Sequence, residues 1–215
     1  MKYKDQFSTS LPVFCGIPQG TVIGPLGFLL MINEIAAELE DRWKYVDDLS
    51  LTEIVSKDSK SNAAGFIDQI TSEAAELNMV VNKDKCSVTT FSFLQNTQPS
   101  FEPPIASELI SHKITLLGVV ISSDLSWREN TKTIVKKANG AIQMLKTLKK
   151  FRVPKDKLKL IFHTFIRPLV EYACPVWHFA LTQDETDKIE HVSEEITANH
   201  LWRFPSTLLL LPQGI

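Results

Sequence analysis

Two adjacent aspartates, Asp47 and Asp48, are the residues of this sequence whose type and spacing best suit chemistry. They stand between two short apolar runs, one ending at Tyr45 and Val46 and the other beginning at Leu49. This pattern predicts two short strands joined by a turn that carries the carboxylates. A polar hairpin turn with no further role is the simplest interpretation, because Asp is common in turns.

A metal site is the alternative interpretation of the same turn. Hard cations such as Mg²⁺ take oxygen ligands and complete their shell with water or substrate phosphates. Neighbouring residues of a strand point to opposite faces, so Asp47 and Asp48 cannot both face one ion directly. One of them is therefore expected to be the main ligand.

Positive charge is concentrated in one part of the chain. Residues 128–167 contain 12 Lys or Arg and 2 Asp or Glu, whereas the rest of the chain contains 11 basic and 23 acidic residues. A solvated helix face would explain such a cluster, but a merely soluble helix usually mixes both signs of charge. The shortage of acidic partners favours contact with nucleic-acid phosphates, which does not read base sequence. The candidate phosphate-binding residues are Lys132, Lys136, Lys146, Lys149 and Lys150.

The elements around the aspartates predict an α+β protein. Up to about residue 125, helical spacing of apolar residues in 26–37 and 62–77 alternates with strand-like runs. These runs are 79–81, 86–93 and 114–121, and the last, with Gly118 inside it, is either a strand or a hairpin. The helical stripe in the first segment is Leu26, Leu29, Leu30, Asn33 and Ala37.

The remainder of the chain is predicted to be helical. Apolar stripes run through 134–148 and 158–169, and Pro154 between them suits the start of a helix. Pro168 and Pro175 are expected to bend or break the later helices. The aromatic side chains Trp127, Trp177 and Phe179 are predicted to lie in the core.

The composition excludes several classes of protein. The chain has 215 residues, 44% hydrophobic and 22% charged, with a formal net charge of -2, as in a globular protein. Three widely spaced cysteines fit neither a disulfide framework nor a zinc module. The start of the chain lacks the apolar region of a secretory signal, and no run reaches the roughly 18 apolar residues of a membrane span. We expect an intracellular protein, nuclear or cytoplasmic and not secreted, without a membrane or a disulfide partner.

Several motifs of this sequence resemble those of one family. Residues 45–48 (YVDD) resemble the YxDD box of reverse transcriptases, and residues 16–26 (GIPQGTVIGPL) resemble the PQG block that precedes this box. The two motifs together are specific, although YxDD by itself is a weak signal. Residues 82–86 (NKDKC) are similar to the N-x-x-K segment that follows the box.

Later motifs narrow the resemblance to non-LTR (LINE-type) retrotransposons. Residues 117–121 (LGVVI) resemble the strand of the primer-grip region. Residues 124–127 (DLSW) and 167–173 (RPLVEYA) look like landmarks of LINE-type polymerases. The resemblance covers about residues 11–192.

The resemblance implies the following organisation and activity. Residues 1–125 would form a partial polymerase palm, an antiparallel sheet with helices, and residues 126–192 an all-helical, thumb-like region, while 193–215 stay unassigned. The intact family performs RNA-directed DNA synthesis, in which Mg²⁺ or Mn²⁺ ions roughly 3.5 to 4 Å apart hold the attacking and leaving oxygens. The implied partners are an RNA template and DNA primer duplex and deoxynucleoside triphosphates.

Roles for single residues follow from the same resemblance. Asp47 would be a catalytic metal ligand, and Asp48 would be its neighbour on the same turn. Lys85 would donate a proton to pyrophosphate, although a solvated loop lysine is an equal alternative. The residues implied to contact the incoming nucleotide and the template are Pro18, Gln19, Gly20 and Tyr45.

The sequence departs from the family pattern at its start. The family carries its first catalytic aspartate on a separate strand several tens of residues before the PQG block, whereas 15 residues precede Gly16 here. Asp5 lies among them, but no apolar strand flanks it. The metal site is therefore expected to be incomplete, and the chain is expected to be a fragment that is inactive alone. The alternatives are a catalytically dead nucleic-acid-binding remnant and a protein-interaction remnant.

Overall fold

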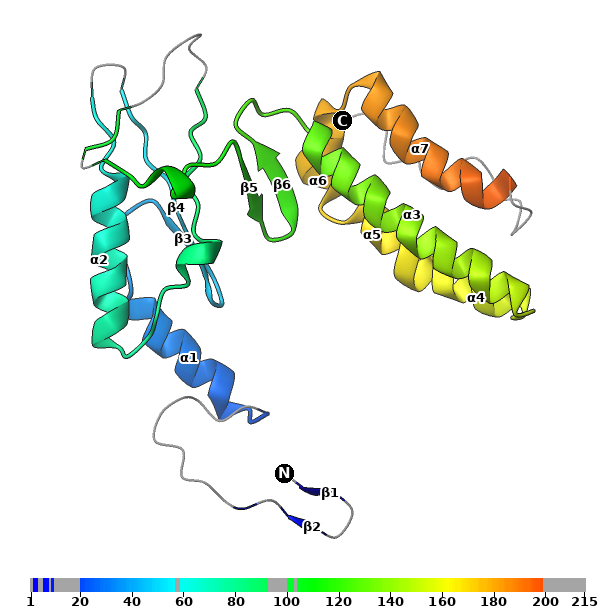
Figure 1. Ribbon diagram of the computed structural model, residues 1–215, viewed down its shortest axis with the longest axis horizontal. Helices are drawn as coiled ribbons and strands as arrows, with labels where there is room; N and C mark the ends of the chain where they lie inside the picture. The colour runs from blue at the N-terminus through cyan, green and yellow to red at the C-terminus, as the bar shows by residue number, and fades with distance from the viewer. Residues whose placement is uncertain are drawn as a thin grey trace. The chain divides into compact units, whose positions relative to one another are not determined.

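The chain is an α+β protein, and the fold class expected from the sequence is confirmed (Figure 1). The structure, a computed structural model, describes residues 2–3, 6–7, 9, 20–56, 59–92, 100–102 and 104–198. In this part the strands pair as three two-stranded antiparallel sheets, β1 (Lys2–Tyr3) with β2 (Gln6–Phe7), β3 (Arg42–Tyr45) with β4 (Asp48–Leu51), and β5 (Lys113–Leu116) with β6 (Val119–Ser122).

The helices carry most of the regular structure. The α-helices are α1 (Ile23–Glu34), α2 (Ala63–Glu76), α3 (Arg128–Lys150), α4 (Lys155–Ile161), α5 (Arg167–Glu171), α6 (Cys174–Trp177) and α7 (Gln183–Ala198). Shorter turns are η1 (Lys83–Lys85), η2 (Ser107–Leu109), the π-helical η3 (Phe162–Ile166) and η4 (His178–Ala180).

Contacts divide the chain into two units. The first comprises Met1–Cys86 and Pro99–Ser107, and the second comprises Ser87–Gln98 and Glu108–Ile215. The β3–β4 hairpin thus belongs to the first unit, and the β5–β6 hairpin belongs to the second together with α3 to α7. The palm and thumb boundaries expected from the sequence stay a prediction.

Helix α1 packs on the core of the first unit, but the side that it buries is not the predicted one. Gly24 and Ile32 are its buried residues, while the predicted stripe is exposed, with Leu30 at 75%. The helix is apolar on every side, and a pattern of this kind locates a helix without indicating which side is buried. The small core beneath it consists of Ile32, Ile35, Ala36 and Ala74, with Phe28, Leu39, Leu49, Ile70, Leu77, Met79 and Val81 packed against it.

Charged side chains fasten the segment between α1 and β3. Lys44 Nζ donates to the carbonyl oxygens of Ile32 (2.9 Å) and Asn33 (2.8 Å) at the end of α1. The N–H of Ala36, a residue with a φ of +54°, donates to Glu73 Oε2 of α2 at 2.5 Å. The last carbonyl groups of a helix lack intrahelical partners; Lys44 donates to two carbonyls of this last turn, and Glu73 accepts from an N–H just beyond the helix.

The predicted strands at 79–81 and 86–93 do not form within the described residues. Val80 is 94% exposed, and Val88 makes only an isolated bridge to Ile110. A strand needs a neighbouring strand for its backbone hydrogen bonds, and an apolar run does not supply that neighbour.

A glycine-containing turn and two hydrogen bonds hold the β5–β6 hairpin of the second unit. Its two turn residues, Leu117 and Gly118, have φ values of +47° and +85°, which suits the tight hairpin turn that favours glycine. Tyr172 Oη donates to the carbonyl oxygen of Leu117 at 2.7 Å. The N–H of Val120 donates to the buried Oδ1 of Asn130 on α3 at 3.2 Å, so the hairpin and α3 form one packed body.

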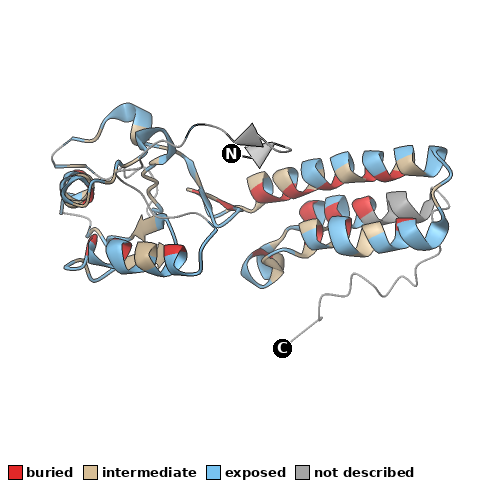
Figure 2. Ribbon diagram, turned by 90° about the horizontal axis from the view of Figure 1, so that it is seen from below, coloured by how far each residue is buried: buried red, intermediate tan, exposed pale blue. Residues whose placement is uncertain are grey.

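The second unit has the larger core, and the predicted stripe of α3 lines it. Buried residues follow one side of α3 (Figure 2). They pack with side chains from β6, α4 to α6 and α7. The core consists of Val119, Ile134, Ala138, Ile142, Leu145, Leu158, Ile166, Val170, Trp177, Ile189 and Val192.

Prolines break the later helices as predicted. Pro168 has no N–H to donate, and its ring crowds the carbonyl of the preceding turn. Directly before α5, the chain forms the wider π-helical turn η3, which relieves such crowding. Ala173, with a φ of +52°, separates α5 from α6, which contains Pro175.

Two of the three aromatic predictions are confirmed and one is wrong. Trp177 is 1% exposed and donates its Nε1–H to the carbonyl oxygen of Tyr172 at 3.0 Å, and Trp127 packs against the same core. Phe179 is 81% exposed instead of buried. It lies on the short turn η4 after α6, and its place there depends on where α6 ends.

We predict that Glu73→Gln destabilises the first unit in a pH-dependent way. The N–H of Ala36, followed by the amide of Gln69, lowers the pKa of Glu73 below its usual 4.5. A lowered carboxyl pKa contributes stability that is complete above the unfolded-state pKa and is lost as pH falls through the folded-state pKa. The charged hydrogen bond is half-buried, so we expect a loss of about 1 kcal/mol in unfolding free energy at neutral pH.

Urea denaturation measured between neutral and strongly acidic pH checks this prediction. The difference between Glu73→Gln and the wild type should vanish as the pH drops well below 4.5. Glu76→Gln, an exposed change on the same helix, is the matched control and should behave as the wild type. An equal loss at every pH would contradict the role of the charge.

Candidate catalytic turn and nucleic-acid interface

The adjacent aspartates lie at a tight hairpin. Strands β3 and β4 pair in the register Arg42 with Leu51, Trp43 with Ser50, Lys44 with Leu49 and Tyr45 with Asp48. Val46 and Asp47 are the two residues of the turn, and Asp48 is the first residue of β4. Two short strands joined by a turn at Asp47 and Asp48 were predicted; the hairpin is confirmed, but its turn lies one residue earlier, at Val46 and Asp47.

The two faces of this hairpin differ in their surroundings. Cross-strand partners share a face, so Tyr45 and Asp48 lie on one face, which also carries the exposed Trp43. The opposite face carries Lys44, bound to the end of α1, and Leu49, which packs on the core of the first unit. Packing of one face therefore leaves Tyr45 and Asp48 exposed, with Asp47 exposed at the turn.

Val46 holds the turn in a costly conformation. Its φ of +55° is a genuine outlier for a β-branched residue. Residues in such sparsely populated regions cost of order 1–3 kcal/mol each and cluster at functional sites. The strained residue here lies directly between Tyr45 and Asp47.

The donor set of the turn partly fits a divalent metal ion. Asp47 and Asp48 offer exposed carboxylate oxygens, the ligand type that hard cations take. Across the described residues, no group of three or more His, Cys, Asp or Glu side chains is arranged to hold a metal ion. The turn can thus supply two neighbouring carboxylates.

The structure describes only some of the other residues implied to act at the catalytic site. Pro18 and Gln19 lie outside the described residues, and the exposed Gly20 has a φ of +79°, which suits glycine. Lys85 is exposed at the end of η1, where its N–H donates to the carbonyl oxygen of Asn82 at 3.1 Å. No hydrogen bond or ion pair of the described residues joins Lys85 to Asp47 or Asp48. Its predicted role stays a prediction.

The basic residues of α3 are spread around its exposed sides. At roughly 100° per residue, Lys132, Lys136 and Lys150 fall within about 40° of one another, away from the buried stripe. Lys146 is half-buried beside them. Lys149 is exposed in the last turn of the helix. The helix therefore has a polar stripe of three aligned lysines with Lys146 beside it, while Lys149 lies on the side of the buried stripe and is exposed because the helix ends there.

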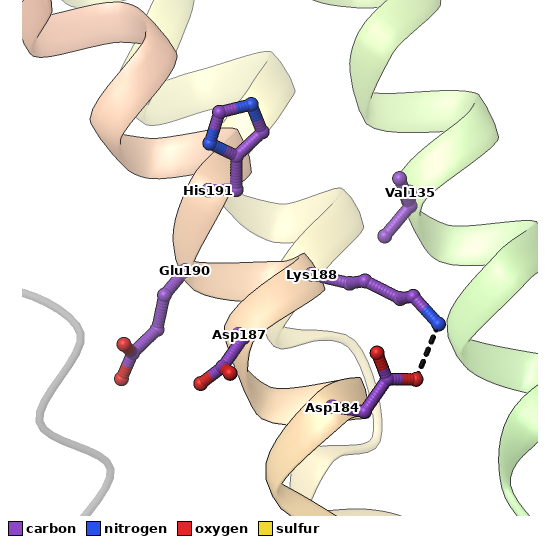
Figure 3. Close-up of a pocket in the computed structure, with 6 residues that line it drawn as sticks. All are labelled: Val135, Asp184, Asp187, Lys188, Glu190 and His191. Atoms are coloured by element: carbon purple, nitrogen blue, oxygen red, sulfur yellow. Dashed lines mark hydrogen bonds and ion pairs between the residues drawn. The ribbon is translucent and has the colours of Figure 1, made fainter.

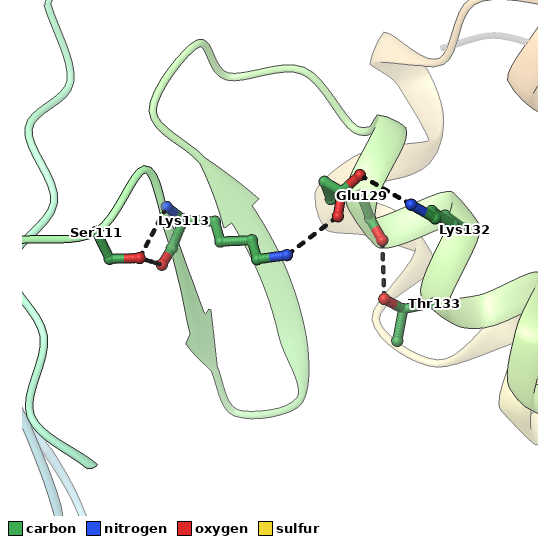
Figure 4. Close-up of polar contacts among 5 residues, drawn as sticks. All are labelled: Ser111, Lys113, Glu129, Lys132 and Thr133. Atoms are coloured by element: carbon green, nitrogen blue, oxygen red, sulfur yellow. Dashed lines mark hydrogen bonds and ion pairs between the residues drawn. The ribbon is translucent and has the colours of Figure 1, made fainter. Parts of the chain in front are cut away.

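Ion pairs reduce the charge of this stripe at one end. Glu129 Oε2 lies 3.1 Å from Lys113 Nζ, and Glu129 Oε1 lies 3.7 Å from Lys132 Nζ (Figure 4). The hydrogen bond from Lys113, followed by the charge of Lys132, lowers the pKa of Glu129. Lys132 thus shares an anion within the protein, and this pairing weakens it as a candidate for binding phosphate.

An acidic hollow lies between α3 and α7. Its volume is about 500 Å³, and it is lined by Val135 of α3 and by Asp184, Asp187, Lys188, Glu190 and His191 of α7, of which Asp184 and Lys188 reach toward Val135 (Figure 3). Lys188 is paired with Asp184. The remaining carboxylates repel phosphates, so nucleic acid is disfavoured on this side of α3.

Lys44 and Glu73 are positioning residues that sequence reasoning missed. Both act through backbone groups near the end of α1, and so they orient the hairpin that carries Asp47. A signal existed for Lys44, because alternation from the exposed Tyr45 places it on the inner face of β3. Glu73 gave no such signal, since its partner Ala36 lies 37 residues away in the sequence.

Comparison with known proteins assigns the chain to a family. A family model described as reverse transcriptase (RNA-dependent DNA polymerase) matches residues 2–121. This is more than half of the chain, and the chain therefore belongs to the reverse transcriptase family. No curated protein and no solved structure matches it. The family match includes the YVDD turn and ends before α3. It therefore does not extend to the helices of the second unit.

Family membership carries general consequences. Reverse transcriptases generally use divalent metal ions and act with a nucleic-acid template and nucleotide substrates. Within the described ranges, no helix is both long enough and apolar enough to cross a bilayer. Cys86 and Cys174 are free thiols, and Cys15 lies outside the described residues.

We predict that Val46→Gly raises the free energy of unfolding of the first unit by about 1 kcal/mol. Glycine adopts positive φ without the steric cost that valine meets, and this gain exceeds the added entropy of the unfolded chain. Urea denaturation followed by circular dichroism measures the change. Val80→Gly is the matched control, because Val80 is exposed and has an ordinary φ, and it should lower stability. A loss in both variants would show that Val46 is not strained.

Proposed function

We propose that this chain supplies part of the palm and the thumb of a non-LTR (LINE-type) reverse transcriptase. The observation that carries the proposal is the β3–β4 hairpin, whose strained two-residue turn presents Asp47 and Asp48 on an exposed edge. The YVDD sequence of this turn lies inside the region matched by the reverse transcriptase family. The reaction class is RNA-directed DNA synthesis by nucleotidyl transfer.

The turn would hold the divalent ions on which the reaction depends. Asp47 is the proposed main ligand and Asp48 the secondary one, for Mg²⁺ or Mn²⁺. When bound, such ions stabilise charge on the attacking 3′-hydroxyl and on the leaving phosphate oxygens. The chain itself contributes rigidity, through the anchored face of β3 and the strained Val46.

Other residues of the first unit would position the nucleotide. Tyr45 shares the exposed face of Asp48, and it is the proposed neighbour of the incoming nucleotide together with Pro18, Gln19 and Gly20. Lys85 would donate the proton that pyrophosphate takes up, because an exposed ammonium can reach a phosphate oxygen. The β5–β6 hairpin of the second unit would serve as the primer grip.

The helices of the second unit would act as the thumb that holds the RNA template and DNA primer duplex. Lys136, Lys146 and Lys150 belong to the polar stripe of α3, and Lys149 is exposed in the last turn on a different side of the helix. Contacts of this type release counterions and are independent of base sequence, as required of a protein that moves along a template. The acidic hollow beside α7 directs phosphates away from the other side of α3.

We also infer that the chain alone does not polymerise DNA. Clamping two ions requires carboxylates on more than one side, and the turn offers two consecutive residues of one hairpin. A catalytically dead nucleic-acid-binding protein is the second candidate function, because the basic surface of α3 does not depend on the metal turn.

Primer extension tests the metal turn. We predict that the chain alone, with a primed RNA template and Mg²⁺ or Mn²⁺, gives no template-dependent extension. Mn²⁺ binding measured by electron paramagnetic resonance should nevertheless be present and should weaken in Asp47→Ala. Asp68→Ala, an exposed change on α2, is the control and should bind Mn²⁺ as the wild type does.

Two results would contradict these inferences. Extension that disappears in Asp47→Ala would show the inferred inactivity to be wrong while confirming the turn as catalytic. Mn²⁺ binding that is equal in Asp47→Ala and the wild type would remove the metal role of Asp47.

Duplex binding at different salt concentrations tests the thumb. We predict that a variant with Lys146, Lys149 and Lys150 changed to Gln binds an RNA–DNA duplex more weakly, with a salt slope smaller by about 3, because each phosphate contact contributes about 1. A variant with Lys60, Lys83 and Lys188 changed to Gln loses the same charge and should keep the wild-type slope. Equal slopes in all three proteins would count against the thumb.

A further inference from the structure

The turn between α3 and α4 presents an exposed aromatic ring at the end of the longest helix. Phe151 directly follows α3 and is 77% exposed. Its N–H donates to the carbonyl oxygen of Thr147 at 3.2 Å. A large exposed ring stabilises the free protein little and is available to a partner.

Backbone bonds hold this turn in one conformation. Arg152 has a φ of +58°, and its N–H donates to the carbonyl oxygen of Lys149 at 3.0 Å. The next N–H, of Val153, donates to the carbonyl oxygen of Leu148 at 3.3 Å. This pair of bonds is the Schellman arrangement that ends many helices, usually with glycine where Arg152 stands. Val153 and Leu148 both pack on the core, so the turn is fastened below while Phe151 projects outward.

Basic residues flank the ring in the sequence. Lys150, Arg152 and Lys155 are exposed, and no ion pair of the described residues involves them. The acidic residue nearest in sequence is Asp156, on the first turn of α4. The acidic hollow adjoins Val135, sixteen residues before Phe151, which is about 24 Å along a helix. Along α3, the ring thus lies farther from this edge of the hollow than the Debye length of about 8 Å at physiological salt.

A comparison with Phe179 shows what distinguishes the turn between α3 and α4 (residues 150–155), called the α3–α4 tip below. Phe179 is exposed to a similar degree, but residues 174–183 (CPVWHFALTQ) contain no Lys or Arg. An exposed ring without cations suits an apolar partner, whereas a ring among cations suits a partner that combines flat aromatic groups with negative charge. Nucleic acid has this combination.

We propose that the α3–α4 tip binds a single-stranded segment of nucleic acid, with one unpaired base stacked on Phe151. Lys150, Arg152 and Lys155 neutralise the phosphates on either side of that base. Bases inside a duplex are covered on both faces by their neighbours, so the ring selects an unpaired or terminal base. The proposal rests on the proposed function of the second unit as a nucleic-acid-binding body, and it adds a preference for unpaired nucleotides at one place.

Fluorescence anisotropy with two labelled oligonucleotides tests this proposal. One is oligothymidine, and the other has equal length and charge but lacks bases at its central nucleotides. Stacking on an aromatic side chain contributes enough that its loss weakens binding about tenfold. We predict that Phe151→Ala weakens oligothymidine binding by about this factor and leaves the abasic oligonucleotide unaffected. Phe151→Tyr should keep the wild-type ratio, and Phe179→Ala is the matched control.

The outcomes separate this proposal from the thumb assignment. An unchanged ratio between the two oligonucleotides in Phe151→Ala overturns the stacking site, whatever the duplex measurements show. Loss of a salt-dependent duplex interaction on changing Lys146 and Lys149, which are not part of the proposed single-strand site, is a distinct result that bears on the thumb alone. Should Phe151→Ala alter sedimentation of the chain without altering oligothymidine binding, the tip is a contact between copies and the proposal fails. Thermal melting of each variant confirms that the second unit is folded.

Discussion

The Lys44 ammonium and the Glu73 carboxylate close the connection from α1 to β3, and the carboxylate turn depends on them. Lys44 binds the last carbonyl groups of α1, and Glu73 binds the N–H of Ala36 just beyond it. Because Lys44 directly precedes Tyr45, these bonds hold the first strand of the YVDD hairpin at its inner face. Burial is the largest cause of the lowered pKa of Lys44, and the carbonyl dipoles at the helix end offset part of this cost.

In the second unit, the corresponding constraint is the separation of basic from acidic surface. Helix α3 carries lysines on its exposed sides and apolar residues on the side that faces the other helices. Helix α7 covers part of it with an acidic surface, and Glu129 shares its charge between Lys113 and Lys132. Charge available for phosphates is therefore greatest toward the end of α3, where the exposed ring of Phe151 also lies. The region matched by the family ends at residue 121, so this chemistry is the independent support for a nucleic-acid role of the helices.

Local patterns predicted both hairpins and the main helices. Asp47 and Asp48 between two apolar runs indicated β3 and β4. The apolar run with Gly118 inside it indicated a strand or a hairpin, and the structure has a hairpin. The stripe containing Ile134, Ala138 and Ile142 indicated the buried side of α3. Each of these signals depends on residues within a few positions of one another. The strands expected at 79–81 and 86–93 did not form, because a strand requires a pairing partner that no local pattern specifies. The buried side of α1 was not predictable either, since that helix is apolar all round.

By itself, the sequence determined the family, the carboxylate turn and the concentration of positive charge, because all three are written in residues close together along the chain. The tertiary structure decided which charged groups serve as anchors inside the protein, as Lys44 and Glu73 do, and which face outward, as Lys150 and Arg152 do. It also decided that Trp177 is buried while Phe151 and Phe179 are exposed. These outcomes depend on contacts between residues far apart in sequence, and residue type and spacing do not specify such partners.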